Sequence, residues 1–280
     1  MGASMAMHLV RAGYDLFIFS RTREKAKALE SAGAIWKDSP AEVSKSSDVV
    51  FSILGFPEDV KSVLLGEKGV IKGIKSSSIV VDMTTSSPEL AVRIESLMKS
   101  KNVLSIDAPV SGGDIGARNA SLAVMCGGAK EGYDQILPIL GVLGSDVEWF
   151  GSAGAGQRTK MSNQILIAST MIGTVESLLY AERANLDLQK VITLLGNGAA
   201  SSWSLSQLGP RMVKEDWEPG FFIKHFIKDI GIALEDASRM GLQLKGLELA
   251  GQFYNEAKAM NFEEKGTQAL FQVLRALNKS

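Results

Sequence analysis

The side chains best suited to proton transfer lie near the middle of the chain. Lys160, Asn163 and Gln164 follow a glycine-rich segment, and the two amides lie three and four residues after the lysine. On a helix this spacing places all three side chains on one face. A lysine beside amides can act as a general acid or base when partial burial lowers its pKa. A solvated lysine is the alternative, but the apolar periodicity of the following residues favours a covered face.

A dense cluster of glycines indicates a second candidate site. The segment from Asp107 to Ala117 holds a proline, Ser111 and three glycines, among them Gly112 and Gly113. Glycines beside a serine allow backbone N–H groups to approach a small anion closely. A plain connecting loop rarely has this composition, so we expect an anion-binding loop here.

The chain opens with a sequence typical of the second half of a phosphate-binding turn. Gly2 fits the third glycine of G-x-G-x-x-G, where a helix and a strand pack too closely for a side chain. A helix over residues 3–12 and a strand over 14–19 are expected to follow. The strand and the two glycines that precede such a turn are absent from the sequence. We therefore expect a dinucleotide-binding unit that lacks its first strand.

Arg21 follows the predicted strand 14–19 and lies between Ser20 and Thr22. An acidic residue at this position bonds the ribose 2′-hydroxyl of NAD, whereas an arginine beside hydroxyls suits the 2′-phosphate of NADP. The alternative is a solvated turn residue. The helix and turn before it favour a role in binding NADP, with NAD as a possible second cofactor.

Two further segments follow the carboxyl ends of predicted strands, where ligands bind in open α/β sheets. Leu54 and Pro57 lie in the first segment, and Thr85 lies in the second, between Thr84 and Ser86. Hydroxyl groups there could bind a nicotinamide amide or a substrate carboxylate. Helix capping by the serines would explain them equally well.

A charged pair interrupts an apolar stretch near the end of the chain. Lys228 and Asp229 follow Phe221 by seven and eight residues, on a predicted helix. Charges at such positions need partners if they are buried, whereas an exposed ion pair is the alternative. His8 and His225 are isolated in the sequence, so neither a metal site nor a Ser-His-acid triad is expected.

These candidate residues require an α/β domain to position them. Residues 48–54, 78–82 and 103–107 are continuous apolar runs, which is typical of strands buried on both faces. Helical segments lie between them, two of which begin with Ser-Pro at residues 39–40 and 87–88. Strands that alternate with helices predict a doubly wound parallel sheet, and we place this domain at residues 1–151.

The pattern changes after residue 151. Six residues, 151–156, contain three glycines and are expected to form a flexible hinge. A long helix is predicted over residues 157–184, interrupted in its apolar periodicity only by Gly173. The remaining residues keep a helical periodicity between glycine breaks. We therefore predict an all-helical second domain over residues 152–280.

Composition excludes several classes of protein. With 280 residues, 45% of them hydrophobic, the chain can build one or two real cores. A net charge of −1 without a basic run argues against nucleic-acid binding. The single cysteine, Cys126, fits a reduced compartment. No continuous apolar run has the length of a membrane span, and no targeting segment is evident.

Taken together, these segments resemble the β-hydroxyacid dehydrogenase family, and most closely its 3-hydroxyisobutyrate dehydrogenase-like branch in plants. The resemblance covers essentially the whole chain and rests on residues 1–9, 20–22, 107–113, 154–164 and 228–229. It implies a Rossmann-like domain joined by a long helix to an all-α domain, an NAD(P) cofactor and a small hydroxyacid or aldehyde-acid substrate. It also implies a homodimer or homotetramer, and a mitochondrial or cytoplasmic location.

The same resemblance implies a role for each candidate residue. Lys160 would be the catalytic acid or base that exchanges a proton with the substrate oxygen. The residues implied in substrate binding are Ser111, Gly112, Gly113, Asn163, Gln164, Phe221 and Asp229. The residues implied in cofactor binding are Gly2, Ser20, Arg21, Thr22, Leu54, Pro57, Thr85 and Lys228. No metal is implied.

The sequence departs from the family pattern at three places. The first strand and its two glycines are absent, Gln164 replaces a common asparagine, and Ala120 replaces a common glycine. The last two changes bear on the substrate rather than on the reaction class.

The leading interpretation is an NADP-preferring oxidoreductase of a short β-hydroxyacid or its semialdehyde or glyoxylate counterpart. The alternatives are a truncated, catalytically silent binding or dimerisation module, and an imine or sugar-acid reductase.

We predict that the protein binds NADPH more tightly than NADH. The Arg21→Glu substitution should weaken NADPH binding specifically, because it replaces a charge-assisted bond to the 2′-phosphate with repulsion. Titration of wild type and variant with both cofactors measures this. Equal or tighter binding of NADH by the wild type would contradict the prediction.

Overall fold

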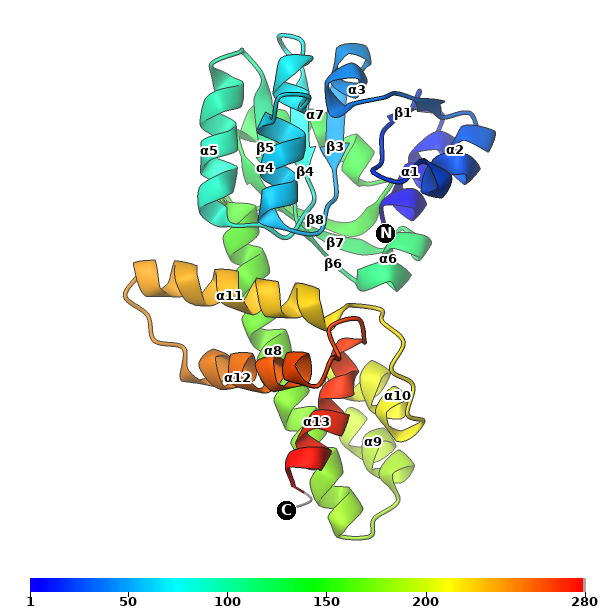
Figure 1. Ribbon diagram of the computed structural model, residues 1–280, viewed down its shortest axis with the longest axis vertical. Helices are drawn as coiled ribbons and strands as arrows, with labels where there is room; N and C mark the ends of the chain where they lie inside the picture. Colours follow the sequence, from blue (N-terminus) through cyan, green and yellow to red (C-terminus); the bar gives the residue numbers. More distant parts are fainter. Residues whose placement is uncertain (279–280) are drawn as a thin grey trace. The chain divides into compact units, whose positions relative to one another are not determined.

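The computed structural model describes residues 1–278 and divides the chain into two units, residues 1–160 and the part from Met161 onward. Each unit is described by itself (Figure 1). The boundary expected at residues 151–152 differs from this division, because the first turns of the long helix contact the strand ends of unit 1.

Unit 1 alternates strands and helices. Its strands are β1 (Phe17–Ile18), β2 (Ile35–Trp36), β3 (Val49–Ser52), β4 (Ile79–Asp82), β5 (Leu104–Asp107), β6 (Val110–Ser111), β7 (Leu122–Gly128) and β8 (Gly144–Trp149). Its helices are α1 (Gly2–Arg11), α2 (Lys27–Ser31), α3 (Pro40–Ser46), α4 (Pro57–Leu65), α5 (Pro88–Lys99), α6 (Gly113–Asn119) and α7 (Lys130–Leu140), with short 3-10 turns at Arg23–Ala26 and Val70–Lys72. The first strand is much shorter than the expected 14–19.

The main sheet is buried on both faces, as the apolar runs predicted. Successive side chains of a strand point to opposite faces. Ile79 and Val81 therefore join one core with α1, α6 and α7, whereas Val80 joins the other core with α4 and α5. Figure 1 shows α4 and α5 together on one face of the strands.

The predicted Rossmann-like parallel sheet is confirmed, although the sheet is mixed rather than parallel throughout. Strands β3, β4 and β5 are parallel, and Asp82 pairs in register with Asp107. Strand β7 runs antiparallel to β5 and β6 and parallel to β8. The reversal follows from the connection, because the chain continues from β5 through Pro109 into β6 and the short helix α6 instead of returning through a full crossover helix.

The long helix α8 (Ala155–Arg183) has 29 residues and continues through Gly173. It has the length and composition of a membrane span, with 39% of its most apolar window buried, although we expected no such segment from continuous apolar runs. Core helices of soluble proteins share these properties. Within unit 2, Ala168, Met171, Val175 and Leu178 of this helix are buried in the hydrophobic core.

Unit 2 is helical, as predicted, apart from one isolated bridge between Phe222 and Gly266. Besides α8 it contains α9 (Leu188–Gly196), a π-helix (Ser204–Leu208), α10 (Gly209–Val213), α11 (Ile223–Arg239), α12 (Lys245–Ala259), a 3-10 turn (Thr267–Ala269) and α13 (Leu270–Leu277). Tyr254 lies at the centre of its core, with its ring 4.9 Å from that of Phe226 and its hydroxyl donating to the Thr267 carbonyl at 3.1 Å.

Strands β1 and β2 form a sheet of their own, separate from β3. Among residues 1–278 no strand pairs with the second edge of β3 or of β1. In a doubly wound sheet, a strand that leads into the turn before Gly2 would pair with these edges.

We predict that an N-terminal extension with an apolar strand and Gly-x-Gly, spaced so that Gly2 is the third glycine of G-x-G-x-x-G, raises both the melting temperature and the NADPH affinity. Four or five buried apolar side chains at about 1.5–3 kcal/mol each contribute roughly 6–15 kcal/mol. Thermal melts of the 280-residue chain and of the extended chain, with and without NADPH, measure this. Equal melting temperatures and equal NADPH shifts would contradict it.

Candidate functional site

The first turn of α8 is held by a buried carboxylate. Asp107 ends β5, and its Oδ1 accepts the Gly154 N–H at 2.8 Å while its Oδ2 accepts the Gln157 N–H at 2.8 Å. The first N–H groups of a helix have no partner within the helix, and a negative charge is favourable beside them. Asp107 therefore caps α8 from a neighbouring strand. Within the glycine-rich segment 151–156, Gly154 is held by this contact. The flexibility expected for the segment stays a prediction.

Gln157 ties the same turn to the end of β4. Its side chain is fully buried, and its Nε2 donates to the Thr84 carbonyl at 2.8 Å while its Oε1 accepts the Ser86 N–H at 2.9 Å. Lys160 lies three residues further along α8 and is also buried, with 6% of its surface exposed. The lysine is therefore on a covered face, as predicted, and its helical turn is fixed to two strand ends.

The hydroxyl groups after β4 have separate roles. The Thr84 hydroxyl accepts the Leu54 N–H at 2.8 Å, so it joins the loops after β3 and β4 and is not directed to a ligand. Thr85 is half-buried. The Ser86 hydroxyl is buried and has no hydrogen-bond partner among the described residues. Ser87, in contrast, caps α5 by accepting the Leu90 N–H at 3.1 Å.

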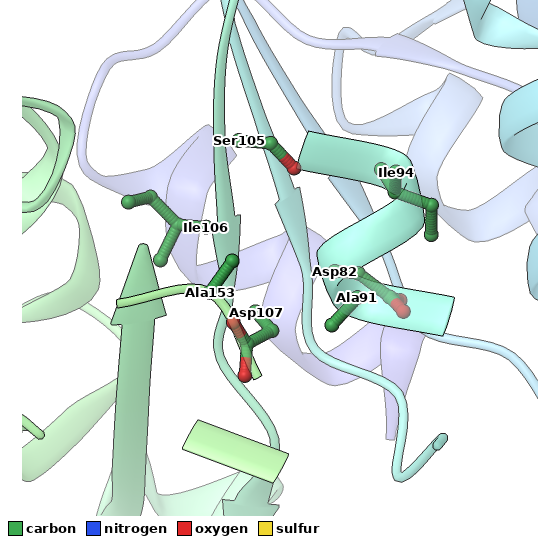
Figure 2. A pocket seen from close by; sticks show the side chains of 7 residues that line it. All are labelled: Asp82, Ala91, Ile94, Ser105, Ile106, Asp107 and Ala153. Atoms are coloured by element: carbon green, nitrogen blue, oxygen red, sulfur yellow. The ribbon is translucent and has the colours of Figure 1, made fainter. Parts of the chain in front are cut away.

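A small cavity lies beside Asp107, between the ends of β4 and β5 and the helix α5 (Figure 2). Figure 2 shows Asp107 next to Ala153, with Asp82 on the adjacent strand. The cavity has room for about one water molecule. It is too small for a substrate. Of the carboxylates that line it, Asp107 accepts from the first turn of α8, and Asp82 accepts from the Ser52 hydroxyl and the Thr84 N–H.

Burial changes the acidity of two groups at this place. Loss of solvation raises the pKa of Asp107 to about 6, although the N–H groups of Gly154 and Gln157 lower it and the nearby Asp82 raises it further. Burial also raises the pKa of Cys126 to about 12, with a smaller contribution from the charge of Asp107. The Cys126 thiol therefore stays protonated and unreactive.

Apart from Lys228, which belongs to α11 of unit 2, the residues predicted to bind a dinucleotide lie in unit 1, at the carboxyl edge of the strands or next to it. Gly2 begins α1, which has no side-chain cap, and a Cβ at Gly2 would lie 3.0 Å from the Ile53 side chain. This confirms the close packing predicted for that glycine. An uncapped helix N-terminus presents free N–H groups, which suit a phosphate. Leu54 follows β3, and Pro57 begins α4.

Arg21 lies with Ser20 and Thr22 in the loop after β1. Its side chain is 76% exposed, and its Nη1 contacts Asp59 Oδ1 of α4 at 3.0 Å. An exposed ion pair of this kind contributes about 0–1 kcal/mol, so a phosphate could replace the carboxylate at little cost. The arginine and the uncapped helix α1 together fit a phosphorylated dinucleotide.

The predicted anion loop is a strand and a helix rather than a plain loop. Ser111 belongs to β6, Gly112 follows with a φ of +121°, and Gly113 begins α6. The positive φ at Gly112 favours glycine, since other residues are strained there. The sequence correctly marked an unusual backbone, but it did not distinguish a turn between two elements from a loop.

A chain of polar side chains lies within unit 2. Asn163 Nδ2 donates to Gln164 Oε1 at 2.7 Å, Gln164 Nε2 donates to Asp229 Oδ2 at 2.6 Å, and Lys228 Nζ lies 2.9 Å from Asp229 Oδ1. The Lys228 and Asp229 side chains are 11% and 1% exposed, so the pair is buried rather than on the surface. Phe221 packs edge-on against Phe226 at 5.6 Å between ring centroids.

Sequence reasoning missed the parts played by Asp107 and Gln157. Asp107 had been noted only as the start of the glycine-rich segment, and Gln157 only as the start of the long helix. An acidic residue at a strand end and a glutamine in the first turn of a helix were the available signals. Neither signal indicates a contact between residues separated by about half of a domain, because that contact depends on the fold.

Comparison with known families identifies both parts of the chain. Residues 1–151 match the NAD binding domain of 6-phosphogluconate dehydrogenase. Residues 154–274 match the family described as NAD-binding of NADP-dependent 3-hydroxyisobutyrate dehydrogenase.

Individual proteins match over nearly the whole chain. The uncharacterized oxidoreductase YkwC of Bacillus subtilis is 46% identical, covering 98% of this chain and 95% of that protein. The probable mitochondrial 3-hydroxyisobutyrate dehydrogenase-like 1 of Arabidopsis thaliana is 47% identical, with coverage of 99% and 83%. The structure of Mycobacterium tuberculosis 3-hydroxyisobutyrate dehydrogenase with L-serine is 27% identical, with coverage of 98% and 96% and a TM-score of 0.88.

We predict that Asp107→Asn removes a pH-dependent part of the stability. Because folding raises the pKa of this carboxyl, its contribution is fully present below its ordinary pKa of 3.8 and is lost as the pH rises through about 6. Between about pH 7 and pH 5 the free energy of unfolding of the wild type should therefore rise by about 1 kcal/mol relative to the variant.

Urea unfolding of both proteins at several pH values measures this difference. The comparison with the variant cancels the titration of all other groups, including His225, whose pKa is lowered by burial. Parallel pH profiles for the two proteins would contradict the prediction.

Proposed function

This chain belongs to the β-hydroxyacid dehydrogenase family, and we propose that it interconverts a short β-hydroxyacid and its semialdehyde or a glyoxylate-type aldehyde acid, with NADP(H) preferred. It is an NAD(P)-dependent oxidoreductase that acts on a small molecule, as the resemblance in its sequence implied. The oxidoreductase function is favoured over a silent binding module and over an imine or sugar-acid reductase.

Lys160 is the observation that carries the proposal. It is buried, and its helical turn is fixed by Asp107 and Gln157 at the strand ends where ligands of such sheets bind. We assign to Lys160 the transfer of a proton to the carbonyl oxygen during reduction, and its removal from the hydroxyl during oxidation.

The other candidate residues are assigned to binding. Ser111, Gly112 and Gly113 would bind the substrate carboxylate through a hydroxyl and backbone N–H groups. Asn163, Gln164, Phe221 and Asp229 would contact the remainder of the substrate. L-serine, which is present in the mycobacterial structure, is itself a β-hydroxyacid, and this supports the proposed class.

The cofactor supplies or accepts the hydride when it is bound. Gly2 and the N-terminus of α1 would hold its pyrophosphate, and Arg21 with Ser20 and Thr22 would hold the 2′-phosphate. The remaining contacts are proposed for Leu54, Pro57, Thr85 and Lys228. The NADP-dependent family matched by residues 154–274 supports the preference for NADP.

We also propose that the chain assembles as a homodimer or homotetramer through unit 2. Leu166 and Tyr180 of α8 are 65% and 77% exposed, and Trp203 is 62% exposed. Large apolar side chains of this exposure favour burial against another surface. Sedimentation velocity measures the oligomeric state, and a monomer would contradict this proposal.

The buried Cys126 and the mitochondrial relative support a location in a reduced compartment, mitochondrial or cytoplasmic.

Lys160→Ala should leave folding and NADPH binding nearly intact while lowering turnover by about two to four orders of magnitude, the usual contribution of a positioned acid or base. Oxidation of 3-hydroxyisobutyrate with NADP⁺ and reduction of glyoxylate with NADPH measure turnover. A loss below about tenfold would mean that Lys160 does not have this role.

A further inference from the structure

We propose that Asp107 and Gln157 are positioning residues, which hold Lys160 for proton transfer by fixing the first turn of α8 to the ends of β4 and β5. This inference rests on the proposed function, because it takes Lys160 as the acid or base. Neither Asp107 nor Gln157 is proposed to contact the substrate; both would affect proton transfer only by holding the first turn of α8.

The carboxylate of Asp107 determines both the position and the rotation of the helix. One oxygen accepts the N–H of Gly154, and the other accepts the N–H of Gln157, both at 2.8 Å. Two bonds to residues three apart fix the turn about its axis, whereas a single bond would leave it free to rotate. Lys160 follows Gln157 by three residues, so its direction is set by the same turn.

The packing around this carboxylate is very close. A Cβ at Gly127 would lie 2.8 Å from Asp107 Oδ1, and a Cβ at Gly156 would lie 2.9 Å from Oδ2 and 2.3 Å from the Met125 carbonyl oxygen. Both positions therefore require glycine. Because glycine has no side chain, α8 can begin directly against β5 and β7. A shift of the helix toward these strands would bring their atoms into contact.

Gln157 fixes the turn from a second direction. Its amide makes two hydrogen bonds to the segment after β4, and its side chain is completely buried. A hydrocarbon side chain of the same length would fill this space without those bonds. The turn that leads to Lys160 is therefore bonded independently to two adjacent strand ends.

The chemistry of Asp107 also favours a role beyond stability. Its carboxylate partners among the described residues are the backbone N–H groups of Gly154 and Gln157. Burying a charge is costly, and serine, threonine or asparagine would cap a helix without that cost. Only a carboxylate, however, accepts two N–H groups with two equivalent oxygens. A need for fixed geometry explains why a charged group occupies this position.

The test compares Asp107→Asn and Gln157→Met with Lys160→Ala, and then combines each with Lys160→Ala. We expect each single positioning variant to lower kcat by about tenfold to a hundredfold, since a small misplacement of a catalytic group has effects of this size. The KM for NADPH and its dissociation constant should change by less than about twofold. Turnover is measured with 3-hydroxyisobutyrate and NADP⁺, and with glyoxylate and NADPH.

In the Lys160→Ala background neither substitution should lower turnover further. Residues that act through one group lose their effect when that group is removed. A purely structural contribution would instead lower turnover by the same factor in both backgrounds, and that result would overturn the inference. Gln157→Met introduces no new polar group, so it carries the test if Asp107→Asn fails to fold.

Ser39→Ala is the matched control. Ser39 caps α3 by accepting the Glu42 N–H at 3.2 Å, in the same unit but on a helix without candidate site residues. It should lower the melting temperature and leave kcat unchanged; an equal loss of kcat would overturn the inference. If Lys160→Ala retained full turnover, the role assigned to Lys160 and this inference would both be overturned, whereas absence of turnover in the wild type would overturn the proposed function. The inference alone would be overturned if Lys160→Ala lowered turnover as expected and each positioning substitution then lowered it by the same factor in the Lys160→Ala background as in the wild type.

Discussion

The contact between Asp107 and the beginning of α8 is the constraint on which much of unit 1 depends. A long helix leaves its first N–H groups without partners, and these groups lie here in the interior rather than in water. The carboxylate at the end of β5 satisfies two of them, and the close approach of Gly127 and Gly156 makes this possible. Loss of solvation raises the pKa of the carboxyl to about 6, so the arrangement depends on pH.

The buried polar groups of unit 2 are also held by hydrogen-bond and charged partners. Asp229 is almost completely buried, but Gln164 donates to one of its oxygens and Lys228 lies beside the other. Removing either partner would leave a buried charge poorly compensated, which costs more than the contact itself contributes. Because Gln164 also accepts from Asn163, the amide has one orientation in this network.

The cofactor residues proposed in unit 1 differ in character from these buried groups. Arg21 is exposed and bonded only weakly to Asp59, so it remains available for a phosphate. Gly2 is fixed by its packing against Ile53, whereas the loop after β1 is set by a sheet of only two short strands. With the roles proposed for Arg21 and Lys160, the preference between NADP and NAD would depend on the charge of a few surface residues, and proton transfer would depend on a buried and closely packed turn.

The sequence alone determined the class of fold, the family and most of the candidate residues. Buried strands such as 79–82, the Ser-Pro helix starts and the long helix all leave local patterns, because burial on two faces and helix capping depend on neighbouring residues. Tertiary structure decided the rest. The antiparallel pairing of β7 with β5, the bonds of Asp107 to the first turn of α8, and the bonds of Gln157 to the segment after β4 join residues that are far apart in the chain. Local propensity carries no information on such contacts, since their energy arises only when the sheet brings the strand ends together.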